Sequence, residues 1–226
     1  MKTLILMHDR EEDAGTIETY LNERQTDIHT VRFYAGDHLP NDALDFDTVV
    51  SMGGPMNVYE EDEYPFLVEE TSFLAQCFEE RLPVLGICLG AQLMAKAAGA
   101  KVTKAPEEET GWYTVSLTEE GQHDPFFSGL PQSFTVFQLH GDTFEIPHEG
   151  TLLATSPACR NQALRISNSL ALQFHLEVQV AKLAIWLIGH NLREDVLKTY
   201  QEIREELDKN AWKLYDNFFG ELVISQ

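Results

Sequence analysis

The chain has 226 residues, and its 37 acidic residues against 16 basic ones give a formal net charge of −21 at neutral pH. This length is enough for one large α/β core, and a surface this acidic repels phosphate backbones, which argues against nucleic acid as a partner. Three cysteines without C-x-x-C spacing argue against a disulfide framework or a zinc site. No segment reads as a membrane span or a signal-peptide core, so we expect a soluble, cytoplasmic protein.

Four short apolar segments in the first half have strand character. They are rich in β-branched residues, and several are apolar on both faces, as buried parallel strands are. These segments are Thr3–Met7, Ile28–Tyr34, Thr48–Met52 and Pro83–Ile87. Helical patterns lie between them. Ile17, Leu21 and Arg24 share one face of the first, and Leu89–Ala98 forms the last, which Gly99 ends.

The segment 66–81 predicts a further helix. Leu67, Leu74 and Phe78 recur there at helical spacing. Four glutamates are expected among its exposed positions, namely Glu69, Glu70, Glu79 and Glu80. The acidic run 60–63 just before this helix is interpreted as a solvated loop, with gating of a pocket as the alternative.

From about residue 101 to residue 175 the pattern changes to short strand candidates with turn residues between them. The candidates are Trp112–Leu117, Phe134–Leu139, Leu152–Ala154, Ala163–Ile166 and Leu170–Phe174. The whole pattern predicts an α/β fold, a doubly wound three-layer αβα sandwich whose mostly parallel central sheet has an antiparallel extension. Ligands of such sheets bind at the carboxyl ends of the strands.

The segment 82–93 has the form of a nucleophile elbow. An apolar run ends in Gly86-Ile87-Cys88-Leu89-Gly90, the thiol counterpart of the G-x-S-x-G turn, and helix-forming residues follow. Small residues on both sides allow strand and helix to approach closely, and a helix N-terminus favours the thiolate of Cys88. The alternative is a packing cysteine, a role in which the flanking glycines have no purpose.

A second chemical signal is the H-x-E segment at His175. A buried-looking strand ends at this histidine, and in extended backbone Glu177 lies on the same side of the chain. A carboxylate held to one imidazole nitrogen fixes the tautomer and steadies the imidazolium, as in a catalytic triad. The alternative is a solvated loop histidine followed by an acidic residue that begins the next helix, which would give the same H-x-E pattern. The pairing with the elbow is what predicts a triad of Cys88, His175 and Glu177.

The segment Gly53-Gly54-Pro55 follows another predicted strand. It has the composition of a tight turn, but glycines also let backbone N–H groups face a ligand closely. The amides of Gly54 and Leu89 would together make an oxyanion hole.

In this order, the GGP loop, the GICLGAQ elbow and the FHLE segment resemble the class I (triad) glutamine amidotransferases. The similarity is strongest to the amidotransferase domain of GMP synthase and its stand-alone relatives, and it covers residues 45 to 178. His140-Gly141-Asp142 resembles a further stretch of the family. One departure is visible, because the family commonly has F-H-P-E and Leu176 replaces the proline here. Leucine also adopts the extended conformation, so we expect the geometry to survive with less rigidity.

The resemblance implies a flavodoxin-like amidotransferase fold and a role for each motif. Cys88 attacks the γ-carboxamide of glutamine or of a γ-glutamyl compound, and His175, oriented by Glu177, protonates the departing ammonia or amine. A γ-glutamyl thioester then remains for water or another amine. The residues that the resemblance assigns to substrate binding are Gly53, Gln92, Gln138, Leu139 and His140.

Other residues with reactive side chains are interpreted more simply. Cys77 is assigned to packing, and Cys159 to a loop thiol. His140 fits a substrate contact and a turn histidine equally well. The histidines show no metal-ligand spacing, so we predict neither a metal nor a cofactor.

We expect residues 1–190 to form the amidotransferase-like domain and residues 191–226 a helical extension packed on it. An apolar stripe at helical spacing follows Glu177, and we favour its burial on the domain's own flank over burial against a partner chain. The stripe is Val196, Tyr200, Ile203, Leu207, Leu214 and Phe218.

Three functions stay open from sequence alone. The favoured one is a self-sufficient hydrolase or transferase acting on glutamine or a γ-glutamyl compound, because no synthetase region or ATP-binding motif is attached. The second is an ammonia-producing subunit of a separate synthetase. The third is a non-catalytic regulatory or binding module of the same fold, which the complete triad disfavours.

Overall fold

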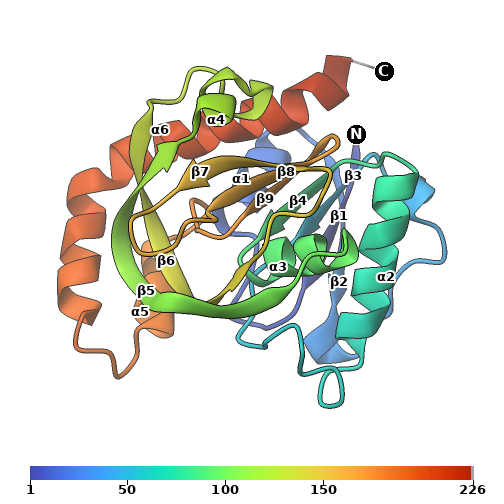
Figure 1. Cartoon of the computed structure of the whole chain (residues 1–226), viewed down its shortest axis with the longest axis horizontal. Coiled ribbons are helices and arrows are strands. Elements are labelled where there is room, and N and C mark those ends of the chain that lie inside the picture. The colour runs from blue at the N-terminus through green and yellow to red at the C-terminus, as the bar shows by residue number, and fades with distance from the viewer. Residues whose placement is uncertain (225–226) are drawn as a thin grey trace.

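The computed structural model describes residues 1–224, and within them nine strands form one sheet that carries helices on both faces (Figure 1). The strands are β1 (Lys2–Met7), β2 (Asp27–Arg32), β3 (Thr48–Ser51), β4 (Val84–Ile87), β5 (Val102–Leu117), β6 (Ser133–Phe144), β7 (Gly150–Thr155), β8 (Ala163–Ile166) and β9 (Ser169–Leu172). The helices are α1 (Gly15–Glu23), α2 (Phe66–Glu79), α3 (Leu89–Ala97), α4 (Glu119–His123), α5 (Val180–Trp186) and α6 (Arg193–Ile224), with short 3₁₀ turns at Phe33–Ala35, Ala43–Asp45 and Pro125–Phe127.

The strand order is β2-β1-β3-β4-β9-β8-β7-β5-β6. The neighbours from β2 to β9 pair in parallel, and those from β9 to β6 pair antiparallel. This arrangement confirms the predicted α/β sheet with an antiparallel extension. Strand β5 begins at Val102, well before the expected segment 112–117. The sequence pattern missed its first half because the residues there are mostly exposed and polar and show no apolar alternation.

Two hydrophobic cores cover the two faces of the sheet. Val50 and Leu85 belong to the core that α1, α5 and α6 complete, whereas their neighbours Val49 and Val84 belong to the core under α2 and α3. Successive residues of a strand point to opposite faces. Strands covered on both sides are therefore apolar at every position, which is the pattern that marked them in the sequence.

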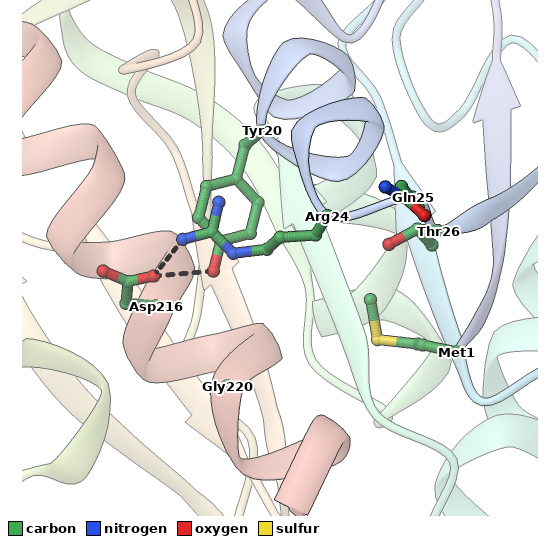
Figure 2. Close-up of a pocket in the computed structure, with 7 residues that line it drawn as sticks. All are labelled: Met1, Tyr20, Arg24, Gln25, Thr26, Asp216 and Gly220. Atoms are coloured by element: carbon green, nitrogen blue, oxygen red, sulfur yellow. Dashed lines mark hydrogen bonds and ion pairs between the residues drawn. The ribbon is translucent and has the colours of Figure 1, made fainter.

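Helix α6 runs along the flank of the molecule and packs on α1 (Figure 1). Its apolar stripe is buried in the chain itself: Ile203 is partly buried, and the other five stripe residues are at most 5% exposed. Asp216 of α6 accepts hydrogen bonds from the Tyr20 hydroxyl at 2.8 Å and from Arg24 at 2.7 Å. Figure 2 shows this cluster beside a surface hollow of about 350 Å³ between the two helices, which contains none of the predicted site residues. The expected domain boundary at residue 190 stays a prediction.

No helix within residues 1–224 combines the length and the apolarity that crossing a bilayer requires.

Two glycines set how closely α3 approaches the sheet. A Cβ atom at Gly86 of β4 would overlap the sulfur of Met94, and one at Gly90 of α3 would overlap the carbonyl oxygen of Ser51. The Gly90 N–H donates to the carbonyl of Met52 at 3.0 Å. The sequence prediction that these glycines permit a close strand–helix contact is confirmed.

Gly90→Ala is expected to lower the free energy of unfolding by about 1–3 kcal/mol, the usual cost of forcing extra atoms into a packed region. A matched control is Gly220→Ala in α6, where a Cβ meets no atom of the described side chains and backbone within 4 Å. This control should raise stability by roughly 0.5–1 kcal/mol, because alanine is the better helix former. Urea unfolding followed by circular dichroism measures both variants, and equal stability of the two would contradict the close approach.

Candidate active site

Cys88 occupies a sharp turn between β4 and α3. Its backbone has φ +51° and ψ −105°, a combination that side-chain-bearing residues rarely adopt and that costs on the order of 1–3 kcal/mol. The Cys88 N–H donates to the carbonyl of Leu172 at 2.8 Å, and the Cys88 carbonyl accepts from the Gln92 N–H at 3.1 Å. These bonds attach the turn to β9 on one side and to the first turn of α3 on the other. Cys88 as a whole is 7% exposed, and it stands at the N-terminus of α3.

His175 lies beside Cys88 and is held by Glu177. Its Nδ1 is 2.6 Å from Glu177 Oε1, and both residues are only 2% exposed. Backbone bonds to Phe137 on β6 hold the histidine in place. Burial alone would lower the pKa of His175, but the charge of Glu177 and the hydrogen bond to Cys88 raise it well above the ordinary value. The arrangement thus favours the imidazolium next to the sulfur.

Two further groups contact the sulfur of Cys88. The carbonyl oxygen of Leu139 is 3.9 Å away, and the side-chain amide of Gln173 donates to the sulfur at 3.7 Å. Gln173 is fully buried, and its oxygen accepts from the Gln92 amide at 3.2 Å. Gln92 therefore supports, through Gln173, the side of the sulfur that faces the protein interior.

Gly54 and Leu89 are neighbours at this site. A Cβ at Gly54 would stand 2.8 Å from a methyl group of Leu89 and 3.0 Å from the Cβ of His8. Leu89 is the first residue of α3, so its N–H is one of the donors left free at a helix start. The two residues therefore adjoin at the start of α3, and their role as oxyanion donors stays a prediction.

A pocket of about 350 Å³ opens over these groups. It is lined by Asp9, Glu11, Glu12, Gly54, Pro55, Cys88, Leu139, His175 and Trp186. Apart from Leu139 in β6 and Trp186 in α5, the lining residues follow β1, β3, β4 and β9 in the chain. The pocket therefore lies at the carboxyl ends of parallel strands, where such sheets bind ligands.

The acidic wall and the tryptophan of this pocket were not expected from the sequence. Trp186 of α5 donates from its ring N–H to the Glu11 carbonyl at 2.8 Å, and its ring centroid is 5.1 Å from that of His175. Glu12 Oε2 and His175 Cε1 lie 2.7 and 3.3 Å from the point where a Cβ at Gly53 would stand. The position of Glu12 after β1 is a signal that could have placed it at this edge. Trp186 carries no local signal.

The residues that the resemblance assigns to substrate binding are placed differently from one another. Leu139 lines the pocket. The other three side chains are buried and bonded within the fold. Gln92 donates to Gln173, and Gln138 donates to Gln162. His140 bonds to Glu109 with one ring nitrogen and to the Asp142 carbonyl with the other. His140 stands in β6, so the turn interpretation of this histidine is wrong. The substrate-binding assignments themselves stay predictions.

Glu109, His140 and Cys159 bring ligand-type atoms within 4.8 Å of one another. The carboxylate of Glu109 already accepts from Ser156 on one oxygen and from Gln162 on the other, and the second oxygen also meets His140 at 2.9 Å. Burial would raise the pKa of Glu109, but these hydrogen bonds and the charge of His140 lower it. Within the described residues, these hydrogen bonds account for the clustering of the three side chains as a buried polar network.

The two other cysteines differ from Cys88 in their surroundings. Burial raises the pKa of the Cys77 thiol to about 12 and also raises that of Cys159. Such thiols are poor nucleophiles at neutral pH, which agrees with the packing role expected for Cys77 and with Cys159 as a loop thiol, here a buried one. The acidic run 60–63 does not line the pocket, and Glu61 pairs with Lys96 at 2.7 Å.

One prediction about α2 is wrong. Glu70 was expected on the exposed face, yet it is fully buried and pairs with His8 at 2.6 Å and with Ser51 at 2.6 Å. At helical spacing Glu70 lies on the same face as Leu67, Leu74 and Cys77, which are buried, so its position in the pattern indicated the interior. Its carboxylate turns inward because two buried partners there replace its hydration.

The comparisons with known proteins agree with this geometry. Residues 14–184 match the family model described as glutamine amidotransferase class-I. The glutamine amidotransferase-like protein YfeJ of Salmonella typhimurium is 31% identical over 96% of this chain and 96% of its own length. The GMP synthase of Bacillus velezensis is 38% identical over 58% of this chain but only 24% of its own length. A crystal structure of a glutamine amidotransferase from Thermotoga maritima has a TM-score of 0.89 at 31% identity, covering 96% of this chain and 97% of that one.

The chain therefore belongs to the class I glutamine amidotransferase family. Membership supports cleavage or transfer of the glutamine amide as the general activity.

Glu12 provides a test of the electrostatics of this site. Burial, together with the charges of Glu177 and Asp9, raises the pKa of Glu12 to about 7, although His175 opposes the shift. Ionisation of Glu12 is thus less favourable in the folded state than in the unfolded state. The protonated carboxyl stabilises the fold fully below pH 4.5, the ordinary pKa of this group, and this contribution is lost as the pH rises through about 7. Glu12→Gln should raise the melting temperature more at pH 8 than at pH 5. Glu69→Gln, an exposed position on α2, is the control and should show no such pH-dependent gain.

Proposed function

We propose that this protein cleaves the γ-amide of glutamine or of a γ-glutamyl compound through a γ-glutamyl thioester on Cys88. The observation that carries the proposal is Cys88 at a positive-φ turn beside His175, whose far nitrogen is held by Glu177 at 2.6 Å. A nucleophile at a strained turn that lines a pocket, an adjacent base and an orienting carboxylate are the parts that activate a thiol. Family membership supports the same chemistry.

The first half of the reaction is acyl transfer to sulfur. The thiolate of Cys88 bonds to the carboxamide carbon, and the carbonyl electrons move to the oxygen, which the N–H groups of Gly54 and Leu89 stabilise. As the tetrahedral adduct collapses, the C–N bond breaks and the His175 Nε2 proton passes to the departing nitrogen. Ammonia or an amine leaves, and Glu177 keeps His175 oriented throughout.

The second half releases the acyl group. A water molecule or an acceptor amine attacks the thioester carbon and gives its proton to His175, and the C–S bond then breaks to restore the thiolate. Gly53, Gln92 and the backbone of 138–140 are proposed to read the α-amino and α-carboxylate groups of the glutamyl part. Leu139, whose carbonyl is 3.9 Å from the sulfur, supports this assignment.

Action as a self-contained enzyme is favoured over action as an ammonia-supplying subunit. Trp186 and the Glu11 backbone form part of the pocket wall from within the same chain. The likeness to GMP synthase supports the second function, in which a separate synthetase would consume the ammonia. Turnover of glutamine and γ-glutamyl compounds by the purified chain separates the two, since a dependent subunit should be nearly idle alone.

Cys88→Ser tests the thioester. Turnover should fall by a factor of roughly 10³ or more, as when other covalent nucleophiles are removed, while stability should change by less than about 1 kcal/mol. Cys159→Ser is the matched control, because its hydroxyl would meet Thr143 Oγ1, now 3.2 Å from the sulfur, outside the pocket. Mass spectrometry should detect a γ-glutamyl adduct on the wild-type protein and on Cys159→Ser, but not on Cys88→Ser. Retained turnover in Cys88→Ser would contradict the mechanism.

A substrate panel defines the leaving group. Asp9, Glu11 and Glu12 line the pocket, so a cationic leaving amine should be cleaved with a higher kcat/KM than an anionic one of similar size. The panel pairs the γ-glutamyl amide of a diamine with that of an amino acid, alongside glutamine and glutathione. Glu12→Gln should bring the kcat/KM values of the two paired substrates closer together. An unchanged ratio in this variant would rule out selection by the acidic wall.

A further inference from the structure

A buried histidine–glutamate pair lies directly behind the GGP loop, and the catalytic chemistry does not use it. His8, at the end of β1, and Glu70, in α2, are both fully buried, with His8 Nε2 2.6 Å from Glu70 Oε2. The His8 ring stacks against the paired rings of Phe33 and Phe66, with its centroid 5.8 Å from each and the two phenyl centroids 4.7 Å apart. A polar pair placed this deep needs partners for all of its nitrogens and oxygens.

The second nitrogen of His8 is bonded to the loop itself. His8 Nδ1 lies 2.9 Å from the carbonyl oxygen of Gly53. A carbonyl oxygen can only accept, so Nδ1 must carry a hydrogen and donate it. Glu70 occupies Nε2 and thereby keeps the other nitrogen available for this donation, whichever of the two residues holds the proton between them.

The Gly53 carbonyl and the Gly54 N–H belong to the same peptide unit. The unit is trans, so its C=O and N–H point in opposite directions. Because the carbonyl is directed to His8 in the interior, the Gly54 N–H is directed away from His8. Gly54 lines the pocket together with Cys88 and His175, which is the side left for that N–H.

The same network fixes the loop against the elbow. Glu70 Oε1 accepts from the Ser51 hydroxyl at 2.6 Å, and Ser51 packs against Gly90. Gly90 in turn donates to the Met52 carbonyl. The two proposed oxyanion donors, Gly54 and Leu89, are therefore held relative to each other through Glu70, Ser51 and the start of α3.

Building on the proposed function, we infer that His8 and Glu70 are positioning residues that aim the Gly54 N–H into the oxyanion hole. They act through the Gly53–Gly54 peptide, and neither side chain lines the pocket. Losing this bond frees the peptide to rotate, which removes one of two oxyanion donors without disturbing Cys88 or His175.

Two substitutions at His8 separate its two hydrogen bonds. Asparagine places an amide nitrogen where Nδ1 stands and keeps the bond to Gly53, whereas glutamine places one where Nε2 stands and keeps only the contact to Glu70. Both variants lose the ring that stacks against Phe33 and Phe66, so their packing losses match. His8→Gln should slow acyl transfer to Cys88 by roughly 10- to 100-fold, and His8→Asn should remain within about 3-fold of wild type.

The readout compares two reactions of the same thiol. Acylation by p-nitrophenyl acetate passes through a tetrahedral oxyanion, whereas alkylation by iodoacetamide does not. In His8→Gln the acylation rate should fall while the alkylation rate stays within about 2-fold of wild type. Equal losses in both reactions, equal acylation in His8→Gln and wild type, or no acylation of Cys88 in wild type would each overturn the inference.

A measurement on the wild-type protein serves if the variants fail to fold. Long-range ¹H–¹⁵N NMR of the imidazole groups should show His8 Nδ1 protonated, and an unprotonated Nδ1 overturns the inference. Failure of the proposed function is distinct from all these outcomes. It would appear as a wild-type Cys88 that reacts with p-nitrophenyl acetate but cleaves no glutamine or γ-glutamyl compound.

Discussion

The arrangement of the site depends on the strained backbone turn at Cys88. A non-glycine residue at φ +51° persists only when its surroundings hold it there. They do so through the bond to Leu172 on one side and the bond to Gln92 on the other. The turn also requires α3 to lie close against β3 and β4. This is why Gly86 and Gly90, two residues before and two residues after Cys88, have no side chain. In return, the turn places a thiol at a helix N-terminus and next to the GGP loop.

The direction of the parallel strands explains how distant segments meet at this thiol. The loop after β1 supplies the acidic wall, the loop after β3 supplies Gly54, β4 ends at Cys88, and the segment after β9 supplies His175 and Glu177. All four strands run the same way, so their carboxyl ends share one edge of the sheet. The antiparallel extension adds Leu139 from β6, which reaches the pocket because β6 bonds to His175.

The sequence predicted most of the sheet because buried parallel strands are apolar at every position, and strand β8 was predicted residue for residue. The exposed half of β5 lacked that signal, since its pairing with β6 depends on tertiary contacts. In the site, Cys88, His175 and Glu177 could be proposed because each carries a local signal: flanking glycines or a two-residue spacing. Trp186 could not, because its role follows from how α5 folds over the pocket, and Glu12 had only its position after β1 as a signal.

Three buried histidines of this chain each pair with a buried glutamate, and local charge alone does not tell them apart. The pairs are His8–Glu70, His140–Glu109 and His175–Glu177, at 2.6, 2.9 and 2.6 Å. What differs is the second ring nitrogen. In His8 and His140 it meets a backbone carbonyl, of Gly53 and Asp142 respectively, which fixes the ring and leaves no free position for proton transfer.

In His175 the second nitrogen faces the sulfur of Cys88 instead. A histidine whose two nitrogens are both bonded within the fold can only orient its neighbours. One with a single nitrogen so held can exchange a proton with a substrate. The same residue pair is thus closed by the fold at two places and left open at the proposed triad, and the partner of the second nitrogen makes the difference.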